Sequence, residues 1–231
     1  MQIRPPIRSF VLRAGRMTAG QERALRDLWP VHGLEFSATH LDLDVLFGRR
    51  ARRCLEIGFG TGECIGSLAE AHPEVDYLGI EVHRPGVGAL LLRAEKSRLA
   101  NLRVICHDAV EVLGEQIPPG SFDEILVFFP DPWHKKRHHK RRLVEADFVQ
   151  RLARALRNGG ILRLATDWEA YAGQMLSVCN AEPLLLSLSP TASYVPRPDL
   201  RPVTRFEKRG ERLGHGVWDL AYTTRSAAID T

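Results

Sequence analysis

The sequence predicts an α/β domain in which helices cover both faces of a doubly wound, mostly parallel sheet with an antiparallel last strand. From Arg53 onward, strand-length apolar runs alternate with longer amphipathic runs. A turn with alternating glycines follows the first apolar run, and one further apolar run, 217–222, follows a long loop. Such alternation indicates βαβ units, whose right-handed crossovers leave few possible topologies.

Residues 1–50 do not share this alternation. We expect them to form a basic N-terminal extension, with the domain proper spanning residues 51–231. The extension contains one helical stretch, 18–28, in which Thr18 can cap the helix and Gln21 completes a capping box. The rest of the extension is expected to be irregular.

The alternating part contains five expected strand–helix pairs. The strands are expected at 54–58, 77–81, 102–107, 124–129 and 161–166, and the helices at 63–71, 85–99, 109–116, 144–157 and 168–179. The helix at 144–157 has the clearest pattern. Phe148, Leu152 and Leu156 recur four residues apart there, and Asn158-Gly159-Gly160 can end the helix.

The C-terminal part departs from the alternation. An apolar run at 184–188 precedes a loop rich in proline and arginine, 194–207. Long loops inside compact domains usually carry function, so this loop is a candidate substrate loop. The run at 217–222 is expected to close the sheet as the antiparallel strand.

The composition excludes several classes of protein. The chain has 231 residues, of which 44% are hydrophobic and 26% charged, as is typical of one globular domain. No apolar run approaches the roughly 20 residues of a membrane-spanning helix, and the first residues lack the apolar stretch of a secretory signal. The cysteines include no CxxC pair and are expected to be reduced (Cys54, Cys64, Cys106 and Cys179). We therefore expect a cytoplasmic protein with no membrane segment.

The net charge of +4 is unevenly distributed. Residues 134–142, HKKRHHKRR, carry six Lys and Arg without an acid, and residues 1–16 carry four Arg without an acid. Because these two segments hold ten positive charges, the remainder of the chain carries −6. This pattern suits contacts with a polyanion at defined places, although a charge run can equally be a solvated loop. We call residues 134–142 the basic run.

The run LEIGFGTG, 55–62, describes a strand that ends in alternating glycines and leads into a helix. Gly58, Gly60 and Gly62 let the backbone approach a ligand at the carboxyl edge of the sheet. A dinucleotide fingerprint would need a third glycine where Glu63 stands, and that acid would repel a pyrophosphate. The spacing E-x-G-x-G-x-G instead resembles the first motif of class I methyltransferases that use S-adenosylmethionine.

Three acids stand in or at the ends of consecutive expected strands. Glu56 lies in the first strand, Glu81 ends the second, and Asp108 follows the third. Each acid alone could cap a helix. Together with the glycine turn they indicate a cofactor site, in which Glu81 would take the ribose hydroxyls and Asp108 the adenine edge.

The fourth strand ends in FFPDPWHK, which places Asp131 between two prolines. The prolines stiffen the backbone and fix the direction of the carboxylate. The segment resembles the (D/N)PP(Y/F) motif of amino-group methyltransferases, except that Trp133 replaces the second proline. This departure indicates a different local geometry.

Seven segments in order, over roughly residues 30–222, resemble bacterial tRNA (guanine-N(7)-)-methyltransferases. They are LEIGFGTG, GIEVHRPGVG, CHDAVEVL, FFPDPWHKKRHHKRR, ATDWEAYA, RPVTRFEKRG and LGHGVWDLAY. The resemblance implies a Rossmann-like class I fold, S-adenosylmethionine as cofactor with S-adenosylhomocysteine as product, and tRNA as partner. It further implies that the methylated base is the variable-loop guanine at position 46.

The resemblance also assigns roles to residues of this chain. It places the cofactor at the glycine turn and at four acids, Glu56, Glu81, Asp108 and Asp131. Asp131 matches the catalytic residue as well. The implied substrate contacts are Lys135, Asp167, Thr204, Arg205, Phe206 and Glu207.

Guanine N(7) has an in-plane lone pair and no proton, so its methylation needs no general base. Asp131 is therefore expected to anchor the base and to stabilise the developing charge. Asp167 and Glu207 can accept from the guanine N(1) and N(2) donors. Lys135 and Arg205 suit phosphate or carbonyl oxygens, and Phe206 can stack on the base.

The basic run begins three residues after Asp131, and this location favours contact with RNA over a solvated loop. Its histidines, His134, His138 and His139, are not expected to bind metal, because no acid accompanies them. Three other functions stay open: an RNA-binding module without turnover, an NAD-dependent oxidoreductase and a small-molecule methyltransferase. The sequence does not indicate an oligomeric state.

Overall fold

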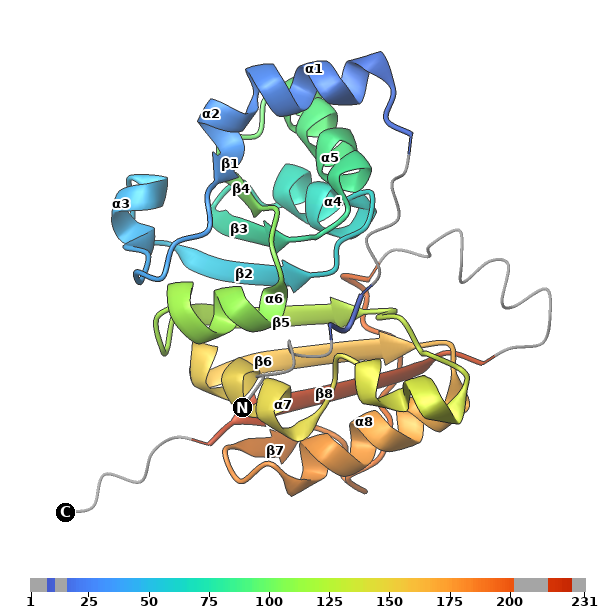
Figure 1. Cartoon of the computed structure of the whole chain (residues 1–231). Helices are drawn as coiled ribbons and strands as arrows, with labels where there is room; N and C mark the ends of the chain where they lie inside the picture. Colours follow the sequence, from blue (N-terminus) through green and yellow to red (C-terminus); the bar gives the residue numbers. More distant parts are fainter. Residues whose placement is uncertain (1–7, 11–15, 202–215, 226–231) are drawn as a thin grey trace, which may run out of the picture.

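The computed structural model describes residues 8–10, 16–201 and 216–225 (Figure 1). Within these ranges one sheet has eight strands in the order β1-β4-β3-β2-β5-β6-β8-β7. The strands are β1 Gly33–Leu34, β2 Arg52–Ile57, β3 Val75–Ile80, β4 Leu102–Ile105, β5 Phe122–Phe128, β6 Leu156–Thr166, β7 Leu185–Ser187 and β8 Trp218–Thr224. β8 runs antiparallel to both β6 and β7, and the other pairings are parallel. The predicted doubly wound sheet with an antiparallel last strand is thus confirmed.

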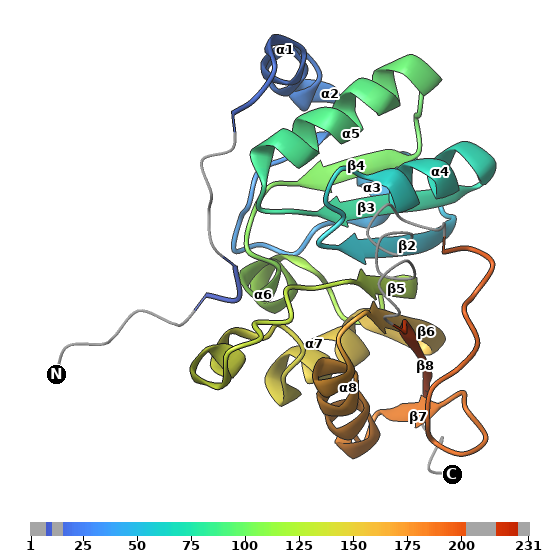
Figure 2. The same cartoon turned by 90° about the vertical axis from the view of Figure 1, so that its right-hand side faces the viewer.

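Helices cover both faces of the sheet (Figure 2). The α-helices are α1 Ala19–Asp27, α2 Trp29–His32, α3 Leu43–Phe47, α4 Glu63–Ala71, α5 Arg84–Ser97, α6 Ala109–Glu111, α7 Ala146–Ala155 and α8 Glu169–Ala181. A π-helical turn, η1 Val112–Gln116, continues α6, and a 3-10 helix, η2 Lys136–Arg141, carries most of the basic run. No helix in the described part of the chain is long and apolar enough to cross a membrane.

The side chains of β2 show how the sheet supports two cores. Leu55 and Ile57 point into the core that α6, α7 and α8 cover, whereas Cys54 belongs to the core under α1, α4 and α5. Successive residues of a strand face opposite sides, so Glu56 lies on the α4 and α5 side. This alternation places a carboxylate inside an apolar layer.

The N-terminal extension has more regular structure than the sequence indicates. Helix α1 begins with the predicted capping box, because the Thr18 hydroxyl accepts from Gln21 N at 3.2 Å and the Gln21 side chain accepts from Thr18 N at 2.9 Å. Two short helices, α2 and α3, and the edge strand β1 follow it. Each has five residues or fewer, which is too short for a hydrophobic period to show.

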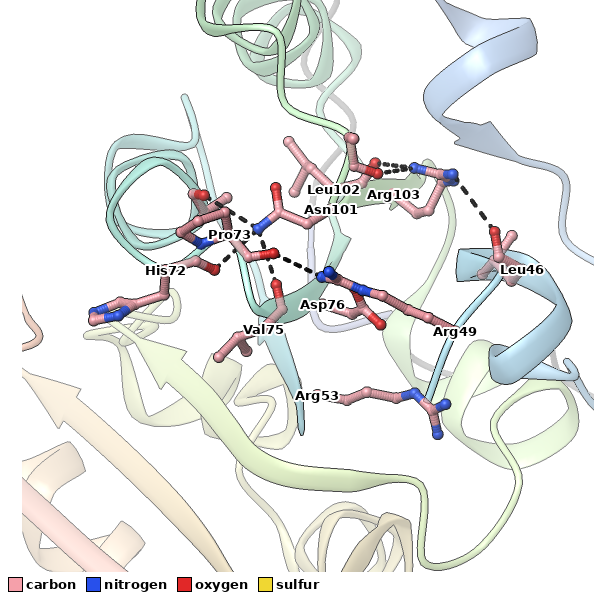
Figure 3. Close-up of polar contacts among 12 residues, drawn as sticks. Leu46, Arg49, Arg53, His72, Pro73, Val75, Asp76, Asn101, Leu102 and Arg103 are labelled. Atoms are coloured by element: carbon pink, nitrogen blue, oxygen red, sulfur yellow. Dashed lines mark hydrogen bonds and ion pairs between the residues drawn. The ribbon is translucent and has the colours of Figure 1, made fainter. Parts of the chain in front are cut away.

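Polar contacts tie the extension to the amino ends of the strands (Figure 3). Arg49 donates to the buried carboxylate of Asp76 at 2.6 Å and to the carbonyl of Pro73 at 2.8 Å. The side-chain amide of Asn101 donates to three carbonyls in the same region, including that of Val75 at 2.9 Å. These contacts brace the edge of the sheet opposite to the glycine turn.

The boundary between α7 and β6 differs from the predicted one. The helix ends at Ala155, and Leu156 already pairs with Phe122 as the first residue of β6. The register then shifts, so that Ile161 pairs with Glu124. Gly159 has a φ of 73° within the shifted segment. The glycine pair therefore forms a bulge in the strand and does not end the helix.

Candidate active site

A cavity of about 810 Å³ lies at the carboxyl ends of β2, β3, β4 and β5. Five of the residues predicted for cofactor or substrate line this cavity: Gly58, Glu81, Asp108, Asp131 and Lys135. They come from four neighbouring strands of a parallel sheet, whose carboxyl ends meet at one edge. The topology thus brings together residues that lie up to 77 positions apart in the sequence.

The three glycines of the turn all have left-handed backbone conformations, with φ of 72° at Gly58, 57° at Gly60 and 77° at Gly62. Glycine is the residue that adopts these angles without steric cost. A Cβ at Gly58 or Gly60 would meet nothing within 4 Å, whereas one at Gly62 would lie 2.6 Å from Leu90. Gly62 is therefore also required for packing, and the first two glycines leave open space beside the backbone.

Glu81 holds the glycine turn in place. Its Oε2 accepts from Gly60 N at 2.8 Å, and its Oε1 accepts from Val82 N at 2.7 Å and His83 N at 2.9 Å. A carboxylate has about four acceptor positions, so three backbone donors leave room for one further donor. Glu81 thus shapes the turn and still faces the cavity.

Glu56 lies behind the cavity. Its side chain is only 4% exposed, does not line the cavity, and has one oxygen with no hydrogen-bond partner in the described structure. Burial raises the pKa of Glu56 to about 8, and repulsion from Glu81 adds to this increase. The carboxyl group therefore carries a proton at neutral pH.

Asp108 has two contacts with different meanings. Its carboxylate accepts from Val110 N at 3.0 Å, as the N-cap of α6, and it also lines the cavity. The adjacent ring of His107 stacks on Phe36, with ring centroids 4.0 Å apart, and contacts Glu111. The helix-cap role and the position at the cavity thus coexist in one residue.

Two strained residues flank the segment that carries Asp131. Phe129 has a φ of 52° and Trp133 a φ of 45°, in the left-handed region that bulky residues rarely adopt. The strain is held by contacts: Phe129 N donates to Ala165 O at 2.8 Å, and Trp133 Nε1 donates to Ser9 O at 2.9 Å. Asp131 itself is exposed to the cavity. We call residues 129–133 the Asp131 loop.

Asp167 follows β6, the strand beside β5, and is half-buried outside the cavity lining. The rings of His134 and Trp168 lie 4.1 Å apart, so the loops after β5 and β6 touch each other. Asp167 is therefore next to the cavity. The other predicted substrate residues, Thr204 to Glu207, lie outside the described residues.

The basic run divides into exposed and buried cations. Lys135, Lys136, Arg137 and Lys140 are exposed, whereas Arg142 is only 4% exposed. Burial and the surrounding cations lower the pKa of His138, so this histidine is neutral at pH 7. Among the residues that the structure describes, no group of three or more His, Cys, Asp or Glu is placed to hold a metal ion.

Several residues at the site were not identified from the sequence. Ser9 and Phe10 line the cavity although they lie outside the resemblance, and Trp133 lines it although the sequence marks this residue only as a departure from a motif. Arg201 is buried at 1% exposure, and its guanidinium lies 5.3 Å from the ring centroid of Phe129. The sequence gives no indication that Arg201 is buried, because it lies in a loop of prolines and arginines and its partner, Asp219, is 18 residues further along the chain.

Comparison with known proteins identifies a methyltransferase family model and close relatives. A family model described as a putative methyltransferase matches residues 50–220. The tRNA (guanine-N(7)-)-methyltransferase of Thiobacillus denitrificans is 57% identical over 222 residues, covering 96% of this chain and 97% of that protein. The protein of the same name from Edwardsiella ictaluri is 56% identical over 216 residues, covering 94% and 91%.

Solved structures share the fold at low sequence identity. The 16S rRNA methyltransferase KamB has a TM-score of 0.56 and 16% identity, covering 81% of this chain and 95% of that one. The 16S rRNA (adenine(1408)-N(1))-methyltransferase from Catenulisporales acidiphilia, in a variant form with S-adenosylmethionine, has a TM-score of 0.54 and 18% identity, covering 84% and 96%. These structures show a Rossmann-like class I methyltransferase fold, and with relatives more than half identical over nearly the whole chain, this protein belongs to the tRNA (guanine-N(7)-)-methyltransferase family.

Proposed function

We propose that this protein methylates N(7) of the variable-loop guanine at position 46 of tRNA, with S-adenosylmethionine as methyl donor. The observation that carries the proposal is one cavity, lined by Gly58 of the glycine turn, Glu81 and Asp108 on one side and by Asp131 and the start of the basic run on the other. The names of the relatives give the same reaction and substrate class. We further propose that it acts in the cytoplasm, where tRNA is modified, with residues 51–231 as the catalytic domain.

The residues at the glycine turn fit S-adenosylmethionine. The open space beside Gly58 and Gly60 would admit a ligand against the backbone, and Gly62 lets the turn pack closely against Leu90. Glu81 would accept from the ribose and Asp108 from the adenine edge. When bound, the cofactor supplies a methyl group on a cationic sulfonium, and an acidic site accommodates such a cation better than it would a pyrophosphate.

The buried carboxyl of Glu56 has a supporting role in this proposal. It is buried behind the turn, and one of its oxygens has no hydrogen-bond partner among the residues that the structure describes. Ionisation of a buried acid becomes more favourable when a cation approaches. Glu56 would therefore respond to the charge of the cofactor without lining the cavity.

The reacting edge suits a base that already has a lone pair. N(7) of guanine needs no deprotonation, so the protein must position the base and stabilise the positive charge that develops on it. Asp131 is exposed to the cavity on a loop fixed at both ends, and its carboxylate can accept from guanine N(1) and N(2) donors. Asp167 and Glu207 would accept further hydrogen bonds, and Phe206 would stack on the base.

The tRNA would approach across the exposed cations beside this edge. Lys135, Lys136, Arg137 and Lys140 present positive charge next to the cavity, and Thr204 and Arg205 would add contacts from the substrate loop. Because a paired or stacked guanine does not reach such a pocket, the variable-loop base must be presented unstacked.

One assay tests the reaction, the base and the position. Purified protein is incubated with labelled S-adenosylmethionine and unmodified tRNA, and the RNA is digested to identify the methylated nucleoside. We expect 7-methylguanosine from the wild-type enzyme. No 7-methylguanosine should form when adenine replaces the guanine at position 46 of the tRNA, or when the Asp131→Ala variant is used. Label on another base, or equal label on the position-46 variant, contradicts the proposal.

A further inference from the structure

Arg142 is the one residue of the basic run whose side chain is buried in the described structure. It is 4% exposed, whereas Lys136, Arg137 and Lys140 of the same run are exposed. A phosphate binds a cation that solvent can reach. The guanidinium of Arg142 is covered by the protein, and its contacts lie within the chain.

The guanidinium of Arg142 has specific partners on three segments of the chain, and its Nη2 lies 3.2 Å from His139 Nε2 on η2. Its Nε donates to the carbonyl of Pro132 at 2.9 Å, and its Nη1 donates to Gln174 Oε1 at 2.6 Å. The guanidinium carbon lies 4.8 Å from the ring centroid of Tyr171, a cation–π distance. Arg142 thus joins the Asp131 loop to helix α8.

The anchoring residues on α8 are themselves fixed. Tyr171 is fully buried, and its hydroxyl accepts from Val144 N at 3.0 Å. Gln174 donates from Nε2 to Val144 O at 3.2 Å and to Glu145 Oε1 at 2.7 Å. Because both partners are held in one orientation, they present a rigid site to the planar guanidinium.

The hydrogen bond to Pro132 acts on a strained peptide. The Pro132 carbonyl belongs to the peptide unit that precedes Trp133, whose φ is 45°. If this peptide rotated toward an ordinary conformation, the direction of the neighbouring Asp131 carboxylate would change. A fixed donor at this carbonyl opposes that rotation.

We propose that Arg142 is a positioning residue, which holds the Asp131 loop in its strained form by fixing the Pro132–Trp133 peptide. It does not serve as a phosphate contact, although it belongs to the basic run. This inference rests on the proposed function, because the group that it positions is the carboxylate assigned to the guanine. The effect belongs to the rate of methyl transfer and not to the affinity for tRNA.

The substitution Arg142→Lys separates positioning from charge. Lysine keeps the positive charge but has no planar fork, so one ammonium cannot serve Pro132, Gln174 and the Tyr171 face together. We expect the single-turnover rate at saturating tRNA and cofactor to fall at least tenfold, while the Kd for tRNA stays within twofold of wild type. Lys140→Ala is the matched control at an exposed cation, and it should weaken tRNA binding and reduce its salt dependence.

Two outcomes of these rate and binding measurements would overturn the inference. One is a single-turnover rate for Arg142→Lys within twofold of wild type. The other is a loss of tRNA affinity and of salt dependence as large as that of Lys140→Ala, which would make Arg142 a phosphate contact. If wild-type protein methylates no tRNA, the proposed function fails instead, and the next measurement still tests the inference.

A spectroscopic measurement reports on the conformation of the Asp131 loop and does not depend on enzyme activity. The protein is labelled with 5-fluorotryptophan, and the Trp133 resonance is assigned by comparison with Trp133→Phe. Arg142→Lys should shift or broaden the Trp133 signal and leave that of Trp218 unchanged. An unchanged Trp133 signal contradicts the inference. If Arg142→Lys does not fold, Gln174→Met removes one acceptor of Arg142 and should produce the same selective change.

Discussion

Several residues at this site adopt locally unfavourable states, which contacts with the surrounding structure stabilise. Glu56 is a buried acid with one oxygen unpartnered among the described residues, and Phe129 and Trp133 adopt backbone angles that favour glycine. Such features concentrate at functional sites because they fix groups that would otherwise relax. In this protein they lie on either side of the cavity, behind the glycine turn and around Asp131.

The raised pKa of Glu56 makes a prediction about stability and pH. Between about pH 4.5 and pH 8 the carboxyl is ionised in the unfolded chain but protonated in the folded one, so stability falls as the pH rises through this range. Glu56→Gln removes the ionisable group. The variant should differ least from wild type near pH 5 and exceed it by a few kcal/mol at pH 8 and above, since one pKa unit is worth about 1.4 kcal/mol.

Urea unfolding at pH 5, 7 and 9 measures this difference. Glu115→Gln, at an exposed position on η1, is the control and should follow the wild-type curve at each pH. If the free energies of unfolding of Glu56→Gln and wild type stay parallel from pH 5 to pH 9, Glu56 is ionised in the folded protein and the assignment is wrong.

At the scale of elements, two arginines hold the two sides of the Asp131 loop. Arg142 connects it to α8, and Arg201 lies against Phe129 while pairing with Asp219 of β8 through Nε and Nη2, both at 2.9 Å. Paired donors of this kind have a defined geometry as well as a charge. The loop after β5 is thus fixed from helix and strand at once.

Removal of the Asp219 carboxylate should therefore destabilise the protein strongly. In Asp219→Ala the buried Arg201 loses the carboxylate with which it pairs, and removal of one partner of a buried ion pair typically costs roughly 3–5 kcal/mol. Chemical denaturation measures the destabilisation. Glu95→Ala breaks the exposed pair of Glu95 with Arg23 and should have a much smaller effect. Equal effects of the two substitutions would show that burial of the Arg201 pair has no energetic consequence.

The elements that the sequence predicts well are those with a long period or a local motif. The apolar positions Phe148 and Leu152 of α7, the capping box at Thr18 and the glycine turn each depend on neighbours in sequence, and the structure has all three features. The short elements α2, β1 and α3 lack such a pattern. The bulge at Gly159 depends on how β6 pairs with β5, and the sequence around Gly159 alone does not indicate this pairing.

The site shows the same division. Gly58, Glu81, Asp108, Asp131 and Lys135 line one cavity because strand ends can be read from the sequence. The burial of Arg142 cannot be read in this way, since its partners on α8 lie about 30 residues further along the chain. The catalytic and binding roles of the site residues predicted from the sequence, including Asp167 and residues 204–207, stay predictions.

At the scale of the whole molecule, two groups of cationic side chains lie at opposite edges of the sheet. The exposed cations of η2 lie beside the cavity, whereas another group of arginines, Arg154 and Arg225 among them, lines a small hollow of about 370 Å³ at the amino ends of β5 and β6. Only the first group adjoins the acids assigned to the reaction. The net charge of +4 hides this separation.

This arrangement predicts which cations control tRNA affinity. Lys136→Gln combined with Lys140→Gln should weaken tRNA binding and lower the slope of log Kd against log salt by about 1.4–1.8, because each phosphate that a cation neutralises adds about 0.7–0.9 to the slope. Filter binding between 50 and 200 mM salt measures the slope. The charge-matched control, Arg154→Gln with Arg225→Gln, should leave the slope unchanged. The same slope for both double variants would place the RNA elsewhere or show non-specific attraction.

The antiparallel direction of β8 also has a practical consequence for how the protein can be handled. The strand leaves the cavity edge at Trp218 and brings Arg225 to the opposite edge, while Ser9 and Phe10 lie against the cavity itself. A biosensor linkage at Arg225 would therefore leave the cavity facing solution. The same linkage at Ser9 would stand at the cavity, so these two positions are not equivalent as immobilisation points.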